Sequence, residues 1–513
     1  MILPKKIKKM ENFVGRKAEW KRLTAIGQTS SEPAILVVYG RRRIGKTELL
    51  EQVFAKRNIL KFEGIRGKSQ EQQKAHVLWQ LSEYVQDPLL SKLKMDSWVE
   101  IFKLINDRVP EGKWTIYFEE VQWLADYKDA FISELKFAWD NYFRYRESWV
   151  IILCGSSPSF IINHVILSKS LYNRSQHELH LKEFGLEETR EFLYPNELKN
   201  ENFEEKPTKS KTHSSTHLGI APRSHREVMD AYLTLGGIPE YLKWCKTSSS
   251  VFISICQNAF TPDSFFSREY ERIFVSSLAE NKHYKAIIQF LANVRFATRE
   301  EILNHLKISS TGTLSSILKD IELCGFIEKY TPYNLNEESR LSRYCIADHY
   351  LQFYYKFIKP IDSEIQRGFF QENPLSAIKM DAYQKWLGFA FERFCRHRNQ
   401  WIAKILGFHG IHYRAGAFFN KKTQKNDPGF QFDLIFDRED RVITLCEIKY
   451  TQAKMGVGVI EEFERKLELF PNPKKKTLQK ILIATEGAND SLLTRHYFDR
   501  VITLEDLFTA DSY

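Results

Sequence analysis

Short apolar segments alternate with amphipathic stretches from about residue 10 to residue 190. A β-branched run at residues 35–39 leads into a glycine-rich loop and then into a helical pattern over residues 48–55. Two further strand-length segments lie at residues 115–120 and 150–154. Because strands that alternate with helices are typical of a parallel sheet covered by helices, this part of the chain is predicted to form an α/β domain.

The pattern changes between residues 194 and 226, where Lys, Ser, Thr, Glu and Pro largely replace the large apolar residues. This composition predicts a flexible insertion or linker that a protease would cut first. Helical patterns resume in residues 227–283, which we expect to form a helical lid.

Residues 284–347 combine three short helical patterns with a pair of strand-like segments, the order of a winged-helix domain. The helices are expected at residues 286–293, 298–305 and 310–324, and the strands at residues 326–330 and 344–347. The third helix carries only Lys319 as a cation, beside Asp320 and Glu322. Because affinity for DNA phosphates depends on cations, a structural or regulatory role is favoured over base readout.

The remaining residues, 348–513, contain a helical pattern through Tyr383–Phe394 and two strand-like segments at residues 430–437 and 442–449. A further helical pattern follows at residues 460–470. This order predicts a second α/β domain at the C-terminal end.

Length and composition agree with several globular domains in one chain. At about 150 residues per domain, 513 residues suggest three or four units. The composition is 43% hydrophobic and 27% charged, and the apolar runs fall short of the roughly 18 residues that a membrane span needs. The lysine-rich N-terminus lacks the apolar core of a secretory signal. We therefore expect a soluble, cytoplasmic protein that has no contact with a membrane.

The cysteine pattern bears on metal binding and redox compartment, and the net charge bears on the class of partner. The seven cysteines form no CxxC pair, which argues against structural zinc and fits a reducing compartment. The net charge of +10 permits a polyanionic partner, although ordinary solubility explains it equally well.

The glycine-rich loop has the sequence GRRRIGKT, which fits the phosphate-binding pattern GxxxxGK[ST]. Such a loop needs glycines where the backbone turns with positive φ, and it points its amides and a helix N-terminus at phosphate. Lys46 is expected to contact the outer phosphates, and Thr47 to bind Mg²⁺. The predicted cofactors are ATP and Mg²⁺, and the predicted nucleotide-binding residues are Gly40, Arg41, Arg42, Arg43, Ile44, Gly45, Lys46 and Thr47.

Two acids, Glu119 and Glu120, end the strand at residues 115–120. In P-loop enzymes the first acid orients the magnesium ligands and the second polarises the attacking water. Glu119 stands where Asp is usual, so its longer side chain should bring the carboxylate closer to the metal. Hydrolysis, rather than binding, is therefore the open question, and solvated acids at a strand end are the alternative.

Two further polar residues are candidates for the nucleotide site. Ser156 follows the strand at residues 150–154 and is expected beside the γ-phosphate, although Gly-Ser-Ser is also ordinary turn chemistry. Arg174 is a candidate to stabilise transition-state charge, in its own subunit or from a neighbouring one. An arginine on the surface is the alternative.

Several of these segments resemble one family as a series. The segments are FVGR at residues 13–16, GRRRIGKT, EEVQWL at 119–124, CGSS at 154–157 and GGIPEYL at 236–242. They are similar to the prokaryotic AAA+/STAND-type ATPases of the archaeal ATPase family over roughly residues 10–245. The resemblance implies an ATPase core at residues 10–193.

A second constellation lies near the C-terminus. Residues i and i+2 share a face of a strand, so Glu447 and Lys449 project together while Ile448 points into the core. Asp433 on the preceding strand can meet them, and Glu392 on the preceding helix adds an acid. Acids and a lysine in this arrangement fit a magnesium site that hydrolyses phosphodiesters.

This spacing resembles the PD-(D/E)XK nuclease superfamily, in particular a nuclease-like domain of undefined function that follows ATPases of this kind. The resemblance covers roughly residues 340–513. It implies metal binding by Asp433, Glu447 and Glu392, and catalysis by Glu447 and Lys449. A nuclease fold retained for scaffolding or binding is the alternative.

The sequence thus predicts an α/β multidomain protein: a P-loop NTPase parallel sheet with a helical lid, a winged helix and a restriction-endonuclease-like α/β domain. The predicted function is an ATPase whose nucleotide state controls a nuclease-like domain that acts on or binds DNA or RNA. The alternative is a regulatory or signalling ATPase switch with an inactive nuclease-like domain that contacts protein partners. Self-association is a further expectation.

Overall fold

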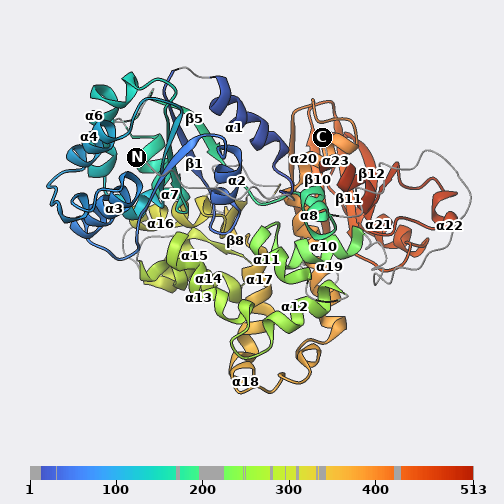
Figure 1. Ribbon diagram of the computed structural model, residues 1–513. Coiled ribbons are helices and arrows are strands. Elements are labelled where there is room, and N and C mark those ends of the chain that lie inside the picture. Colours follow the sequence, from blue (N-terminus) through green and yellow to red (C-terminus); the bar gives the residue numbers. More distant parts are fainter. Residues whose placement is uncertain are drawn as a thin grey trace, which may run out of the picture.

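The structure is a computed structural model. It describes residues 13–29, 32–168, 171, 174–195, 225–246, 248, 250–277, 281–294, 296–307, 311–330, 333, 342–420 and 429–511. The predicted linker at residues 194–226 lies almost entirely outside the described residues. Figure 1 shows two sheets on opposite sides of the molecule, with a group of helices between and below them.

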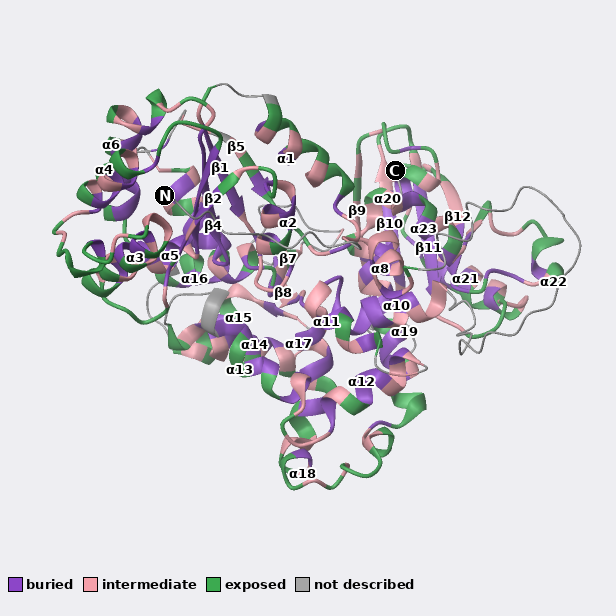
Figure 2. Cartoon of the chain, in the orientation of Figure 1, coloured by how far each residue is buried: buried purple, intermediate pink, exposed green. Residues whose placement is uncertain are grey.

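The N-terminal sheet is parallel throughout, with the strand order β2-β3-β4-β1-β5, which confirms the predicted α/β domain. Its strands are β1 Ala34–Tyr39, β2 Asn58–Glu63, β3 Trp114–Glu119, β4 Val150–Gly155 and β5 Ser175–His180. The associated helices are α1 Lys17–Thr29, α2 Lys46–Val53, α3 Gln70–Val85, α4 Trp98–Arg108, α5 Val121–Leu124, α6 Ala130–Asn141, α7 Pro158–Phe160 and α8 Leu186–Leu193. Two separate hydrophobic clusters cover the two faces of the sheet, so its central strands are buried on both sides (Figure 2).

Helices follow, together with a small antiparallel sheet of order β6-β8-β7. The helices are α10 His225–Leu235, α11 Pro239–Lys243, α12 Val251–Ala259, α13 Phe265–Ser277, α14 Lys282–Asn293, α15 Arg299–Leu306 and α16 Thr311–Leu323. The strands are β6 Ala297–Thr298, β7 Ile327–Tyr330 and β8 Arg343–Ile346. The sequence pattern missed β6, because a strand of two residues shows no alternation.

The C-terminal sheet is mixed and has the strand order β13-β12-β11-β10-β9. Its strands are β9 Tyr413–Asn420, β10 Phe430–Arg438, β11 Val442–Lys449, β12 Thr477–Ala484 and β13 Arg500–Ile502. The helices of this region are α17 His349–Phe353, α18 Asp362–Gln366, α19 Met380–His397, α20 Asn399–Ile405, α21 Gly458–Glu468, α22 Asp490–Leu493 and α23 Leu504–Asp511. Within the described ranges, no helix is both long and apolar enough to cross a membrane.

One hydrophobic cluster joins the segments after the N-terminal sheet. It runs from Phe184 to Phe508 and takes in α8, the middle helices, α19 and one face of the C-terminal sheet. The last helix, α23, packs against α8, α10 and α20. At this contact Asp511 accepts a hydrogen bond of 2.9 Å from the backbone N–H of Glu187. The regions that the sequence separates as lid, winged helix and C-terminal domain therefore share a core.

Candidate nucleotide site and C-terminal acid cluster

The loop between β1 and α2 bends sharply at its two glycines. Gly40 has φ +150°, and a Cβ at this position would collide with the backbone carbonyl of Leu181. Gly45 has φ +87° and precedes the first residue of α2. These conformations cost glycine little, and they let the chain turn tightly from β1 into the N-terminus of α2, where backbone amides lack partners within the helix.

Lys46 begins α2 and is largely buried. Its ammonium donates hydrogen bonds of 2.9 Å each to the carbonyl oxygens of Gly40 and Arg41. The ammonium is therefore held across the mouth of its own loop. A loop with free amides, a helix N-terminus and one ammonium fits the polyphosphate of a nucleotide.

Thr47 and Glu119 lie together where α2 begins and β3 ends. The Thr47 hydroxyl donates to Oε1 of Glu119, which also accepts a hydrogen bond of 2.9 Å from the Tyr117 hydroxyl. The other oxygen of Glu119 is ion-paired with Lys61 of β2. Burial would raise the pKa of Glu119, but the charge of Lys61 and these hydrogen bonds outweigh it and lower the pKa. A hydroxyl beside an ionised carboxylate is a donor set that fits Mg²⁺.

Glu120 follows β3 in the left-handed conformation, with φ 53°. Its Oε2 accepts hydrogen bonds from the Ser156 hydroxyl at 2.6 Å and from the Ser156 backbone N–H at 3.1 Å. The amide of Gln122 donates to the same oxygen at 2.6 Å. Ser156 is thus buried against Glu120 at the ends of β3 and β4, and its hydroxyl holds a carboxylate in the structure.

Two residues at the ends of the motif series also make specific contacts, Arg16 with the loop and Gly237 with Phe184. The Arg16 guanidinium donates to the carbonyl of Ile44 at 3.1 Å, and its backbone N–H donates to Glu188 at 2.5 Å. At the far end of the series, Gly237 accepts a hydrogen bond of 2.7 Å from the Phe184 backbone N–H. A Cβ at Gly237 would collide with the Phe184 backbone, so only glycine allows this approach.

The side chains of Arg41 and Arg43 point to other parts of the protein. Arg41 is ion-paired with Asp348, which caps α17, and Arg43 with Glu269 of α13 at 2.6 Å. Both carboxylates are buried. Arg41 and Arg43 can therefore contact a nucleotide through their backbone, whereas their side chains form ion pairs with other segments of the chain.

The structure contradicts a role for Arg174 within its own nucleotide site. Arg174 forms hydrogen bonds of 2.8 and 3.1 Å with Asp140 of α6. The following residue, Ser175, pairs with Ile35 near the start of β1. In a parallel sheet this is the edge opposite to the phosphate loop, so the prediction in its same-subunit form is wrong. A role in a neighbouring subunit stays a prediction.

The predicted acids of the C-terminal region lie close together, and those on the sheet are buried. Asp433 and Glu447 are almost fully buried on the neighbouring strands β10 and β11. Asp433 accepts a hydrogen bond of 3.2 Å from the Ile448 backbone N–H. Burial, followed by the charges of Glu392 and Glu447, raises the pKa of Asp433 to about 7. The structure therefore brings the three predicted acids into electrostatic contact.

A lysine that sequence reasoning missed neutralises this cluster. Lys466 of α21 donates 2.8 Å hydrogen bonds to both oxygens of Glu447. Lys449 is 3.0 Å from Glu447, as the i, i+2 spacing predicts, and 3.2 Å from Glu462. The available signal was the pair Glu462 and Lys466 at i, i+4 on one face of a helix.

The predicted metal site is not assembled in this arrangement. Over the described ranges, no group of three or more His, Cys, Asp or Glu side chains is placed to hold a metal ion. In addition, both oxygens of Glu447 are bound by an ammonium group. Metal binding by Glu392, Asp433 and Glu447 would require Lys466 to move.

A family comparison finds a similarity in the N-terminal region. Residues 13–244 match the family of an ATPase domain found predominantly in Archaea. An uncharacterized protein of Methanocaldococcus jannaschii is 26% identical over 446 residues, which cover 86% of this chain and 88% of the relative. Because 446 residues exceed the range of the ATPase domain, this likeness continues into the C-terminal part.

Two solved structures match this chain at low sequence identity. A Walker-type ATPase of Pyrococcus abyssi is 18% identical, and the match covers 69% of this chain and 98% of that chain with a TM-score of 0.47. The ORC2 protein of Aeropyrum pernix is 13% identical, with coverage of 71% and 97% and a TM-score of 0.43.

Replacing Lys466 by Met should destabilise the C-terminal region, because it leaves the buried Glu447 carboxylate with Lys449 as its remaining cation. The expected loss is about 3 kcal/mol, measured as a lower urea midpoint of unfolding. The control is Glu462→Gln, which removes the more exposed acid of the same cluster and should cost less than about 1 kcal/mol. Equal midpoints for the two variants would contradict the buried ion pair.

Proposed function

We propose that this protein binds ATP with Mg²⁺ and hydrolyses it. The observation that carries the proposal is that the phosphate loop, Thr47, Glu119 and Glu120 meet at one edge of a parallel sheet within a matched ATPase domain. Ligands of open α/β sheets bind at this carboxyl edge of the strands.

The residues divide the work as follows. The loop amides and Lys46 hold the phosphates, and Thr47 with Glu119 holds Mg²⁺, which when bound supplies charge stabilisation for phosphoryl transfer. Glu120 orients and deprotonates the attacking water. Ser156 positions Glu120, because its hydroxyl and its N–H both donate to that carboxylate. Lys61 keeps Glu119 ionised.

Two substitutions should separate binding from turnover. Lys46→Ala removes a charge-assisted contact and should weaken ATP affinity at least about ten-fold, measured by titration calorimetry. Glu120→Gln should retain affinity and lower phosphate release by about 100-fold or more. Lys56→Ala, an exposed lysine just after α2, is the control. Equal phosphate release from wild type and Glu120→Gln would remove Glu120 from the mechanism.

We further propose that the nucleotide state is passed to the rest of the chain through Arg41 and Arg43. Each lies in the loop that holds phosphate, and each is paired with a buried carboxylate on α17 or α13. Glu269 also accepts a hydrogen bond of 2.8 Å from Tyr241 of α11. Moving the loop would leave these buried carboxylates without the arginine that neutralises each of them, so the loop and the helices should move together.

Hydrogen exchange can test this coupling. A non-hydrolysable ATP analogue should change the exchange of the α13 amides in wild type, and Arg43→Ala should abolish that change while nucleotide binding persists. Arg42→Ala is a matched control, because in the described part of the chain Arg42 forms no ion pair. The same nucleotide response in both variants would rule out the ion pair as the connection.

For the remaining segments we propose a winged helix at residues 284–347 and a PD-(D/E)XK nuclease-like domain that binds nucleic acid. The order of helices and strands supports the first. The adjacency of Asp433, Glu447 and Lys449 on β10 and β11 supports the second. Because Lys466 neutralises Glu447, binding is favoured over cleavage in the arrangement described here.

Cleavage is the second candidate function, supported by the position of Asp433 and Glu447 on neighbouring strands, where Asp433 accepts from the Ile448 backbone N–H. If the site cleaves, Mg²⁺ or Mn²⁺ should produce cuts in DNA or RNA, and Glu447→Gln should reduce them about 100-fold or more. Glu461→Gln, an exposed acid on α21, is the control. Absence of cleavage by wild type with either metal would favour the regulatory switch.

A further inference from the structure

A large cavity lies between the small antiparallel sheet and the C-terminal sheet. Its volume is about 1370 Å³. Its walls come from β7 and β8, from the second half of α19, and from residues 409–419 including most of β9. Pockets for small ligands usually measure about 300–1,000 Å³, so this one has room for a larger ligand.

The walls of this cavity are strongly basic. Five described lining residues are Lys or Arg: Lys329, Lys356, Arg393, Arg396 and Arg414. Among the described lining residues Glu328 is the one carboxylate, and it is 3.2 Å from His397. Five cationic side chains and one carboxylate give the described walls an excess of positive charge, so the cavity is suited to an anion.

Arg393 indicates most directly where an anion would bind. Burial, reinforced by the like charge of Arg396, lowers the pKa of Arg393 to about 10. Its guanidinium donates to the neutral side-chain amide of Gln352. In the described part of the chain no carboxylate forms an ion pair with Arg393, so an incoming phosphate would be its direct ionic partner.

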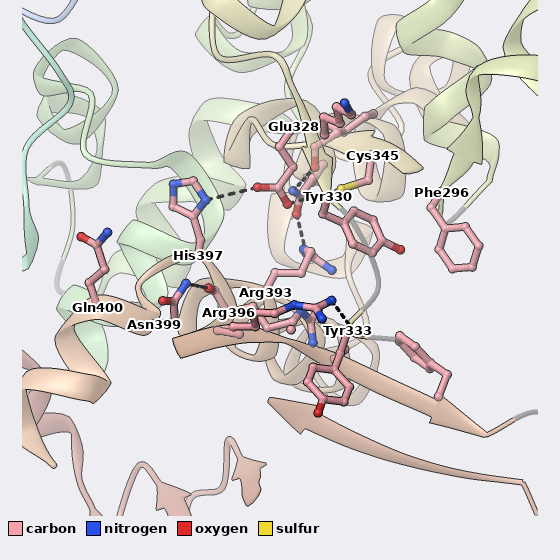
Figure 3. Close-up of a pocket in the computed structure, with 18 of the residues that line it drawn as sticks. Phe296, Glu328, Tyr330, Tyr333, Cys345, Arg393, Arg396, His397, Asn399 and Gln400 are labelled. Carbon is pink, nitrogen blue, oxygen red and sulfur yellow. Dashed lines mark hydrogen bonds and ion pairs between the residues drawn. The ribbon is translucent and has the colours of Figure 1, made fainter. Parts of the chain in front are cut away.

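Aromatic side chains accompany these cations. Figure 3 shows Arg393 and Arg396 between His397 on one side and the rings of Tyr330 and Tyr333 on the other. Phe296 also lines the cavity. Cations that hold a phosphate backbone beside rings on which bases stack are the recognition chemistry of single strands.

We propose that this cavity binds a single-stranded segment of DNA or RNA. A double helix keeps its bases paired and stacked, whereas a single strand can offer its bases to the aromatic side chains. The cavity also borders the acid cluster, because Arg396 donates to the backbone carbonyl of Asp433 at 3.3 Å and is 3.8 Å from Glu392. The inference rests on the proposed nucleic-acid role of the C-terminal region and requires neither ATP hydrolysis nor cleavage.

Fluorescence anisotropy with labelled oligothymidylate and oligouridylate of about 20 nucleotides tests the proposal on the full chain. The triple variant Lys329→Glu, Lys356→Glu and Arg414→Glu reverses three exposed charges in the cavity. It should weaken binding at least about ten-fold and flatten the salt dependence by about two in log–log slope. The matched control reverses Lys92, Lys94 and Lys113, three exposed lysines of the ATPase domain.

An aromatic variant separates stacking from charge. Tyr330→Ala should weaken single-strand binding about ten-fold, whereas Tyr330→Phe should retain it. Equal weakening by both charge triples, or no measurable binding by folded wild type, would overturn the proposal. Competition by thymidine monophosphate as effective as that of the oligonucleotide would also overturn it, in favour of a mononucleotide site. Lys46→Ala should bind single strands normally, so failure of the ATPase proposal would be seen separately.

Discussion

A buried carboxylate that stays ionised needs a cation beside it, and this constraint recurs at the important junctions of the protein. Glu119 is paired with Lys61, Glu269 with Arg43, and Glu447 with Lys466. Each of these carboxylates is buried. A buried carboxylate that lost its cation would be strongly destabilising, so each pair holds two segments in one relative position.

The same pairs explain why the nucleotide site and the middle helices form one unit. The phosphate loop needs a backbone that bends at Gly40 and Gly45, and its intervening arginines are then free to reach outward. Arg41 and Arg43 do so, which links the site of phosphate binding to α17 and α13. The proposed switch therefore depends on the ion pairs that Arg41 and Arg43 form with Asp348 and Glu269.

In the C-terminal region an acid cluster and a basic cavity lie next to each other. On one side of Arg396 lies the acid cluster, in which Lys466 neutralises Glu447. On its other side lies a cavity whose described lining has five cationic side chains and one carboxylate. A shared core from Phe184 to Phe508 and the packing of α23 on α8 hold this region against the ATPase domain.

Local sequence determined the strand, loop and helix of the phosphate site, because these elements are consecutive and their glycines and apolar runs act over a few residues. It also determined β10 and β11, whose observed bounds match the predicted segments closely. The tertiary structure alone decided the partners of the charges: Arg174 lies at the opposite edge of the sheet, and Lys61 and Lys466 neutralise the predicted acids. The reason is that a charge pairs with whichever group folding brings near it, and the proximity of groups far apart in the sequence is not encoded in their spacing along the chain.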